Sequence, residues 1–251
     1  MSTTVAQTRP ADRTALILSR RRFEHYFFSG SAWLMLAAVV IGFGPTYYFA
    51  GVFNAPLPSR IIHVHGALFS CWILLLIAQN SLVFAGRVDI HRKLGLVGFV
   101  MACLMVVVGW AAATDRLVRG TAPPGLDTYF FYITPMTDIF IFATLIFFAF
   151  RLRRDPPAHK RIIYIATVGL LIAAIARFPF SWLFHKAPHA AMASYVFLLM
   201  LVGYDLWSTR KVHRATLWAS GFLIFVQQIR VPIGKTAAWH SFAAGVQSLF
   251  R

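Results

Sequence analysis

Charge is scarce in this chain, and acidic side chains are the scarcest. Only 13% of the 251 residues are charged, and only eight are Asp or Glu. A soluble domain carries about 25% charged residues. Because 59% of the residues are hydrophobic, this composition excludes an ordinary water-soluble globular protein.

The motifs of several common protein classes are also missing. The two cysteines, Cys71 and Cys103, lie inside apolar segments with no CxxC pair, so we predict no disulfide. The chain has no HExxH, no Gly-rich phosphate loop and no GxSxG, which excludes the enzyme classes that depend on them. Residues 1–26 lack the apolar core and cleavage site of a signal peptide, and we expect them to form a basic cytoplasmic segment.

Seven apolar stretches fill most of the remaining sequence. A helix needs about 20 apolar residues to cross a bilayer, and backbone groups in lipid must be satisfied within the segment. We therefore predict an all-α bundle of seven transmembrane helices. The stretches are Phe27–Phe49, Arg60–Phe84, Lys93–Ala113, Tyr129–Phe150, Arg161–Trp182, Ala190–Trp207 and Ala215–Ile233.

The positive charges follow the predicted topology. Sixteen of the 24 Lys and Arg residues lie before the first stretch or after the second, fourth and sixth. By the positive-inside rule, the N-terminus is cytoplasmic and the C-terminus lies outside. Contact with the lipid bilayer accounts for the net charge of +16, so no nucleic acid partner is expected. We predict a cell inner membrane protein with a membrane domain at 27–233 and a short outer tail at 234–251.

Asp138 is the deepest ionisable residue in the predicted membrane domain. The fourth stretch begins near Tyr129, which places Asp138 about 13 Å along the helix, close to the membrane midplane. Intramembrane acids are expensive and usually face the bundle interior. Two interpretations remain open: a protonated acid bonded to a neighbouring helix, or a functional acid that carries protons, pairs with an arginine or lines a ligand pocket.

Arg177 and Arg230 lie toward the outer ends of their stretches. Each either extends to the lipid headgroups or pairs with Asp138. With Gln227, Gln228 and His63, these residues predict a polar pocket open to the outside, as in a transporter or a sensor.

His63 and His65 open the second stretch. Residues two apart on a helix point about 200° apart, so both cannot face one centre. We expect His63 to face the interior, because it shares a face with small residues such as Ala67 and Ser70. Imidazole is a common metal and haem ligand, but histidines also occur at membrane interfaces without such a role. A metal-dependent membrane enzyme would use His63, His65 and His185.

Two further motifs carry a resemblance. The turn Gly-Arg-x-Asp-x-His-Arg-x-Leu-Gly contains His91, and the later turn Pro-x-x-His-Lys-Arg contains His159. Together with the His-x-His opening, they resemble a group of uncharacterised bacterial multi-spanning membrane proteins that is loosely similar to transmembrane b-type cytochromes. The resemblance covers the second to fifth stretches. It implies that His91 and His159 hold a haem b, with propionate contacts to Arg92, Lys93, Lys160 and Arg161.

The leading hypothesis is therefore a haem-b-like electron-transfer protein. Electrons would pass between a cytoplasmic centre at His91 and His159 and an outer centre at His63 and His65, with quinone or a redox partner protein as donor. The alternatives are the transporter or sensor, the metal-dependent enzyme and a structural subunit of a larger membrane complex.

Overall fold

The computed structural model describes residues 10–55, 58–184 and 186–250, with side chains from Arg22 onward apart from that of Ala187. The described residues form eight α-helices and one π-helical turn, η1, and contain no strand. The prediction of an all-α protein is confirmed for this part of the chain. The elements are α1 (Pro10–Phe43), η1 (Gly44–Tyr48), α2 (Arg60–Phe84), α3 (Val88–Val118), α4 (Thr128–Arg151), α5 (Pro156–Ile175), α6 (Ala187–Thr209), α7 (Arg214–Gly234) and α8 (Ala237–Leu249).

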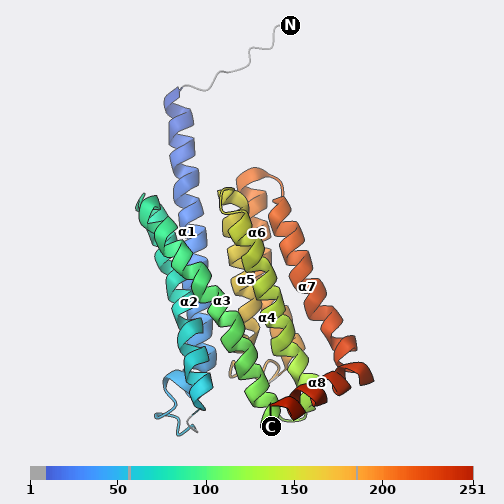
Figure 1. Ribbon diagram of the computed structural model, residues 1–251. Coiled ribbons are helices and arrows are strands. Elements are labelled where there is room, and N and C mark those ends of the chain that lie inside the picture. Colours follow the sequence, from blue (N-terminus) through green and yellow to red (C-terminus); the bar gives the residue numbers. More distant parts are fainter. Residues whose placement is uncertain (1–9, 56–57, 185, 251) are drawn as a thin grey trace.

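Helices α1 to α7 run up and down as one bundle (Figure 1). The start of α1 and the α2–α3, α4–α5 and α6–α7 turns lie at one end, which we call the N-terminal end. The other three connections and α8 lie at the opposite end, the C-terminal end. The basic turns that suggested a cytoplasmic side thus gather at the N-terminal end.

Six helices are long and apolar enough to cross a membrane: α1 continued by η1, and α2 to α6. This agrees with a multi-pass membrane protein. The seventh predicted span, α7, is 21 residues long but carries two glutamines and an arginine in its second half. Helix α5 ends at Ile175, and not at Trp182 as predicted, because Pro179 follows closely and disfavours the helical conformation before it.

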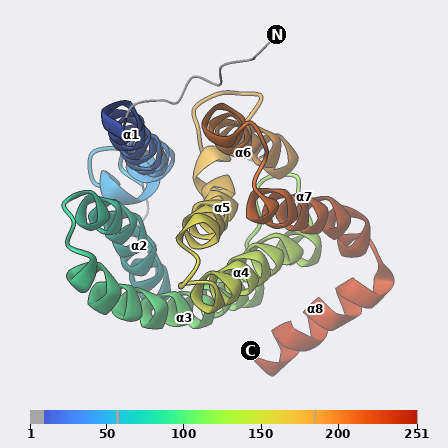
Figure 2. The same cartoon turned by 90° about the horizontal axis from the view of Figure 1, so that it is seen from above.

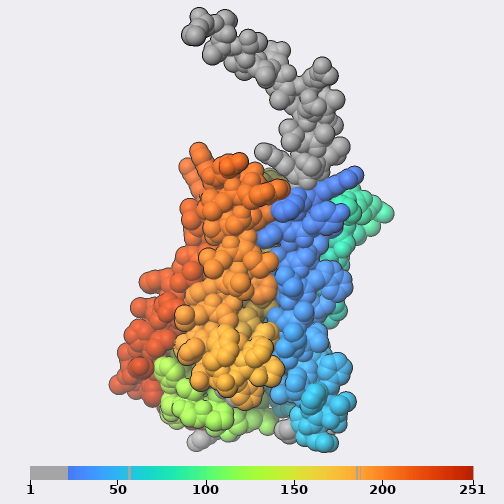
Figure 3. All heavy atoms as spheres, turned by 180° about the vertical axis from the view of Figure 1, so that it is seen from behind, coloured from blue at the N-terminus to red at the C-terminus, as the bar shows by residue number. Residues whose placement is uncertain are grey.

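Helix α5 is the centre of the bundle. It packs against α1, α4, α6 and α7 (Figure 2), and α1 and α6 lie side by side over it on the rear face (Figure 3). Most of its side chains are buried. Its Thr167 accepts a hydrogen bond from the indole of Trp72 on α2, at 3.1 Å. This bond connects α2 to the central helix.

Helices α1 and α5 approach each other very closely at Gly42 and Ala174. A Cβ on Gly42 would overlap the backbone carbonyl of Ala174, so only glycine permits this approach. Gly30, three turns earlier on α1, has open space where its Cβ would be.

We expect Gly42→Ala to destabilise the protein by about 1–3 kcal/mol, because the two backbones must separate. Gly30→Ala is the matched control and should leave stability unchanged or slightly raised, since alanine favours a helix. Thermal unfolding of the two variants in detergent measures the difference. Equal unfolding temperatures for both variants would contradict the contact.

The predicted tail at 234–251 contains a helix that the sequence analysis did not predict. Helix α8 lies across the C-terminal end of the bundle (Figures 1 and 2), and Thr236 caps its start by accepting from the Trp239 amide at 3.2 Å. The Trp239 indole donates to the Tyr129 carbonyl at 2.8 Å. Gln247 donates to the Leu117 carbonyl at 2.7 Å. These bonds attach α8 to α3 and α4.

Candidate polar sites inside the bundle

A buried ionic network holds the N-terminal end together. Arg161 of α5 donates from Nε and Nη2 to Oδ1 of Asp205 on α6, at 2.9 and 2.5 Å. The other oxygen, Oδ2, accepts from the Thr216 hydroxyl at 2.6 Å and from the His213 amide at 3.0 Å. Arg161 also donates from Nη1 to the Pro157 carbonyl at 2.8 Å. The side chains of the pair are 4% and 0% exposed, so both charges are desolvated and fully hydrogen-bonded.

The same network reaches α1 through Glu24. Lys160 Nζ lies 2.5 Å from Glu24 Oε1, and the Tyr204 hydroxyl donates to Glu24 Oε2 at 3.1 Å. Lys160 and Arg161 are therefore already paired with acids. The resemblance implied four basic residues in contact with haem propionates, and these two are bound to protein carboxylates instead. Four helices meet in this network, and its complete pairing indicates a structural role.

His213 caps α7 within this network: its Nδ1 accepts from the Ala215 amide at 3.1 Å. Burial lowers the pKa of His213 from its ordinary value, and the positive charge of Arg161 lowers it further. Lys160 acts in the same direction, while the acids Asp205 and Asp155 oppose it. The folded protein thus favours the neutral imidazole, which alone can accept the capping bond.

We predict a loss of stability as the pH falls below about 6.5. The unfolded chain binds a proton at His213 more readily than the folded protein does, so stability is complete above the unfolded pKa and declines below it. The lost cap is worth about 1 kcal/mol. His213→Asn keeps a capping side chain but does not titrate, so its melting temperature should fall less between pH 7 and pH 5. Parallel curves for both proteins would refute this role of His213.

A second ion pair lies at mid-depth between α4 and α7. Arg230 Nη1 donates to Asp138 Oδ1 at 2.7 Å and lies 3.4 Å from the Thr137 hydroxyl. The Arg230 side chain is 4% exposed and that of Asp138 is 13% exposed. Thr137 Oγ1 in turn donates to carbonyls of its own helix. The structure therefore brings together two of the three charged residues of the predicted pocket.

Gln227 lies one turn before Arg230 on the buried side of α7. It is 2% exposed, and neither its amide oxygen nor its nitrogen has a hydrogen-bond partner in the described part of the chain. Each unpaired buried polar atom costs about 1–3 kcal/mol. The Asp138–Arg230 site thus differs from the Asp205 network, since it leaves polar groups free to bind something else.

Arg177, the third residue of the predicted pocket, does not reach Asp138. It lies just beyond α5 at the C-terminal end, with its guanidinium 4.7 Å from the centre of the Phe43 ring, and it donates to the Ala173 carbonyl of its own chain segment. Of the two alternatives open for Arg177, pairing with Asp138 is not seen among the described residues. The reason is the early end of α5, which directs Arg177 toward α1 and α3.

His91 and His159 both lie at the N-terminal end, at the starts of α3 and α5, and both are half-buried. The ring of His159 bonds through Nδ1 to the Ala149 carbonyl at 2.8 Å, which leaves Nε2 free. The Nδ1 of His91 is buried with no protein partner among the described residues. Gln79 donates to the His91 carbonyl at 3.3 Å.

The exposure of His63 and His65 is the reverse of what we predicted. His63 is exposed, whereas His65 is partly buried, with its ring centre 4.1 Å from that of Phe69. The small-residue face of α2 is covered by tyrosines of η1 and not by the bundle centre: the Tyr47 ring packs on Gly66 and its hydroxyl donates to the His63 carbonyl.

A metal centre at these histidines gains no support. Within the described ranges, no group of three or more His, Cys, Asp or Glu residues could hold a metal ion. His185, the third ligand of the hypothesised enzyme site, lies outside the described residues.

Comparison of the chain with protein-family models, with curated proteins and with solved structures finds no match.

Proposed function

We propose that this protein is a membrane transporter or solute sensor whose binding site is the Asp138–Arg230 pair with Gln227. One observation carries the proposal: the buried amide of Gln227, one helical turn before Arg230 of the buried Asp138–Arg230 pair, has no hydrogen-bond partner among the described residues. A pair kept only for stability would be fully bonded, as Asp205 is. Charged groups in a membrane interior mark solute and proton pathways in many proteins.

The chemistry of the site favours a small zwitterionic solute. An ammonium group would take the place of Arg230 at Asp138, and a carboxylate would take the place of Asp138 at Arg230, so that no charge is left unpaired. The amide of Gln227 offers both a donor and an acceptor to the same molecule. Asp138 alone could also exchange its ion pair for a proton, which would release Arg230.

If a solute binds at this site, water must also reach it. Cysteine labelling measures whether water reaches position 227. Gln227→Cys, in a chain with Cys71→Ala and Cys103→Ala, should react with a membrane-impermeant thiosulfonate from one side of the membrane. Ala219→Cys is the matched control on α7, because Ala219 is fully buried. Glycine, as the smallest zwitterionic probe, should slow the reaction at position 227.

Labelling at position 227 that is as slow as at position 219 would overturn the proposal. With labelling established, uptake of radiolabelled glycine into proteoliposomes distinguishes a transporter from a sensor.

The proposal includes seven membrane spans, with the N-terminus in the cytoplasm and the C-terminus outside. The second half of α7 is polar because it carries the site, which explains its lower hydropathy. Helix α7 packs along α4 and α5, and the basic turns gather at one end of the bundle. Accessibility labelling of tags at the two termini tests this topology: tags on the same side of the inner membrane would refute it.

A second candidate function is electron transfer through a haem b at His91 and His159. It is supported by the bond from His159 to the Ala149 carbonyl, because such a bond fixes the ring and leaves Nε2 for iron. The Nδ1 of His91, buried and without a partner among the described residues, favours a ligand nearby. When bound, haem would supply one-electron chemistry, and quinone or a redox partner protein would exchange the electrons.

The visible absorption spectrum of the purified membrane protein tests this second function. A bis-histidine haem should give a Soret band that His159→Ala removes, while His189→Ala, at an exposed histidine, keeps it. Absence of the band after purification from haem-supplemented cells would dispose of the haem hypothesis.

A further inference from the structure

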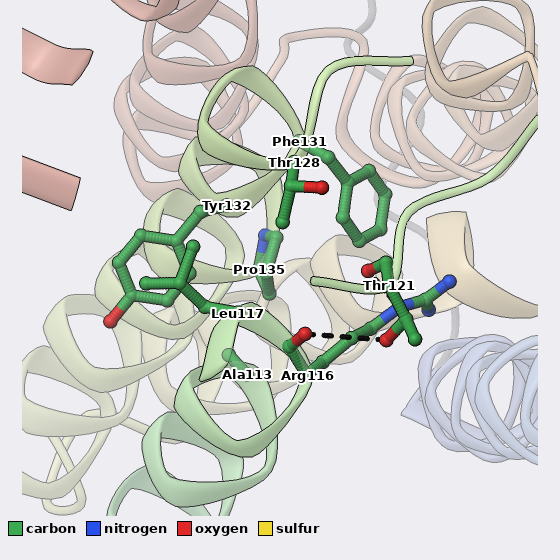
Figure 4. Close-up of a pocket in the computed structure, with 8 residues that line it drawn as sticks. All are labelled: Ala113, Arg116, Leu117, Thr121, Thr128, Phe131, Tyr132 and Pro135. Atoms are coloured by element: carbon green, nitrogen blue, oxygen red, sulfur yellow. Dashed lines mark hydrogen bonds between the residues drawn. The ribbon is translucent and has the colours of Figure 1, made fainter. Parts of the chain in front are cut away.

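Two cavities in the described part of the chain differ greatly in size. The one beside Arg116, Phe131 and Tyr132 at the C-terminal end (Figure 4) has a volume of about 10 Å³, which is room for no more than about one water molecule. The other is a groove between α4 and α7 at the N-terminal end, with a volume of about 760 Å³. Ligand sites in proteins measure about 300–1,000 Å³, so of these two cavities only the groove is large enough for a ligand.

Aromatic side chains form the walls of the α4–α7 groove. The two helices pack against each other (Figure 2), and Phe148 of α4 meets Trp218 of α7 edge-on, with ring centres 5.3 Å apart. Phe147 lies beside Phe148 at 5.4 Å, and Phe222 lines the groove one turn after Trp218. The side chains of Phe147, Phe148 and Trp218 are exposed, so the groove opens to the surroundings of the bundle.

One end of the groove carries a positive charge that the protein does not neutralise. Arg151, the last residue of α4, lines the groove about 10 Å along the helix from Thr144, which lines it farther inside the bundle. Arg151 is exposed and forms no ion pair with a described residue. Asp155, the nearest acid in the sequence, instead caps α5 by accepting from the Ala158 amide at 3.3 Å. A counter-charge for Arg151 must therefore come from a bound partner.

The rest of the N-terminal end adds to this positive charge. Arg214 begins α7 one turn before Trp218. The α4–α5 and α6–α7 turns contribute the further basic residues Arg153, Arg154, Arg210 and Lys211. Basic groups at the end of a membrane helix attract anionic lipids. The groove thus combines an apolar length with a cationic end, which fits an amphiphile that has an anionic head.

We propose that the α4–α7 groove binds one anionic phospholipid, whose phosphate pairs with Arg151 and whose acyl chain lies against Phe148 and Trp218. A guanidinium matches phosphate oxygens with paired hydrogen bonds, and the groove buries part of the apolar surface of the chain. A phosphatidylcholine headgroup has no net charge and gains less at a basic surface. The inference rests on α7 lying in the membrane. It is independent of the proposed solute site, so its test and the labelling test can fail separately.

Native mass spectrometry of the full chain in a mild non-ionic detergent tests the proposal. With equimolar phosphatidylglycerol and phosphatidylcholine added, one phosphatidylglycerol should stay bound under conditions that remove phosphatidylcholine. Excess inorganic phosphate should not displace it, because the acyl chain supplies part of the binding. Three results overturn the proposal: no preference for phosphatidylglycerol, its displacement by phosphate, or a retained fatty acid or isoprenoid quinone in its place.

Two arginine variants connect the retained lipid to the charged end of the groove. Arg151→Gln should weaken phosphatidylglycerol binding about tenfold, the usual effect of losing a hydrogen bond to a charged group. Arg153→Gln removes the same charge two residues away, but Arg153 does not line the groove and donates to the Phe150 carbonyl at 3.0 Å. It should leave binding nearly unchanged. Equal weakening by both variants would show a general charge effect and overturn the site.

Two tryptophan variants test the place of the acyl chain. Trp218→Ala removes an aromatic wall of the groove and should weaken retention of phosphatidylglycerol. Trp33→Ala is the matched control, because Trp33 is exposed on α1 and does not line the groove. Melting temperatures of both variants check that they are folded. Equal retention by the two folded variants would contradict an acyl chain in the groove.

Discussion

Asp205→Asn should destabilise the protein by about 3–5 kcal/mol, the typical effect of removing one partner of a buried ion pair. The substitution leaves the Arg161 guanidinium buried without a counter-charge. It also places an amide NH2 where a carboxylate oxygen accepts from Thr216 and from the His213 backbone. Thermal or denaturant unfolding in detergent measures the loss.

Two further variants separate the charge effect from general damage to the helix interface. Arg161→Met in the Asp205→Asn background removes the uncompensated charge and should recover part of the stability. Arg119→Gln removes a pair whose arginine side chain is 57% exposed, and it should change stability by less than about 1 kcal/mol. If Asp205→Asn were as mild as Arg119→Gln, the N-terminal end would not depend on this network.

The sequence predicted the helices better than the contacts between them. The bounds of α2 agree with the prediction at both ends, and those of α7 agree within one residue, because hydropathy and the flanking charges mark where an apolar helix ends. Helix α8 was missed, although its apolar residues Trp239, Phe242, Val246 and Leu249 recur at helical spacing. Its 13 residues are too few to cross a bilayer, so it does not stand out as a membrane span.

The sequence only weakly indicates which distant residues form pairs in the folded protein. Asp138 and Arg230 are 92 residues apart, and their meeting was one of two open alternatives. Asp205 was overlooked, although a lone acid in an apolar stretch calls for a buried cation. Its partner Arg161 was counted among the cytoplasmic basic residues, because sequence alone does not show that the side chain turns back into the bundle.

The faces of α2 were assigned wrongly for a related physical reason. Small residues beside His63 suggested the bundle centre, since helices approach closely at such residues. In the structure, that face accepts the aromatic rings of η1, and the Tyr48 hydroxyl bonds to Ser70 at 2.5 Å. A small-residue stripe thus predicts close packing but does not identify the partner that packs there.

The Asp138–Arg230 pair should respond asymmetrically to the loss of its two members. Asp138→Asn leaves Arg230 buried as a cation that cannot lose its proton, and should lower stability by about 3–5 kcal/mol. Arg230→Gln leaves a carboxyl group that can neutralise itself by binding a proton, so its loss should be smaller by at least about 1 kcal/mol. The double variant removes both charges and should be more stable than Asp138→Asn alone.

At this site, a variant should be able to regain stability and still lose its response to the solute. The double variant Asp138→Asn/Arg230→Gln regains stability but has no charge for either end of a zwitterion, so glycine should no longer protect position 227 from labelling. Unfolding curves and labelling rates on the same preparations check both expectations. Equal losses for the two single variants would contradict the buried ion pair, and glycine protection retained in the double variant would contradict its role in binding.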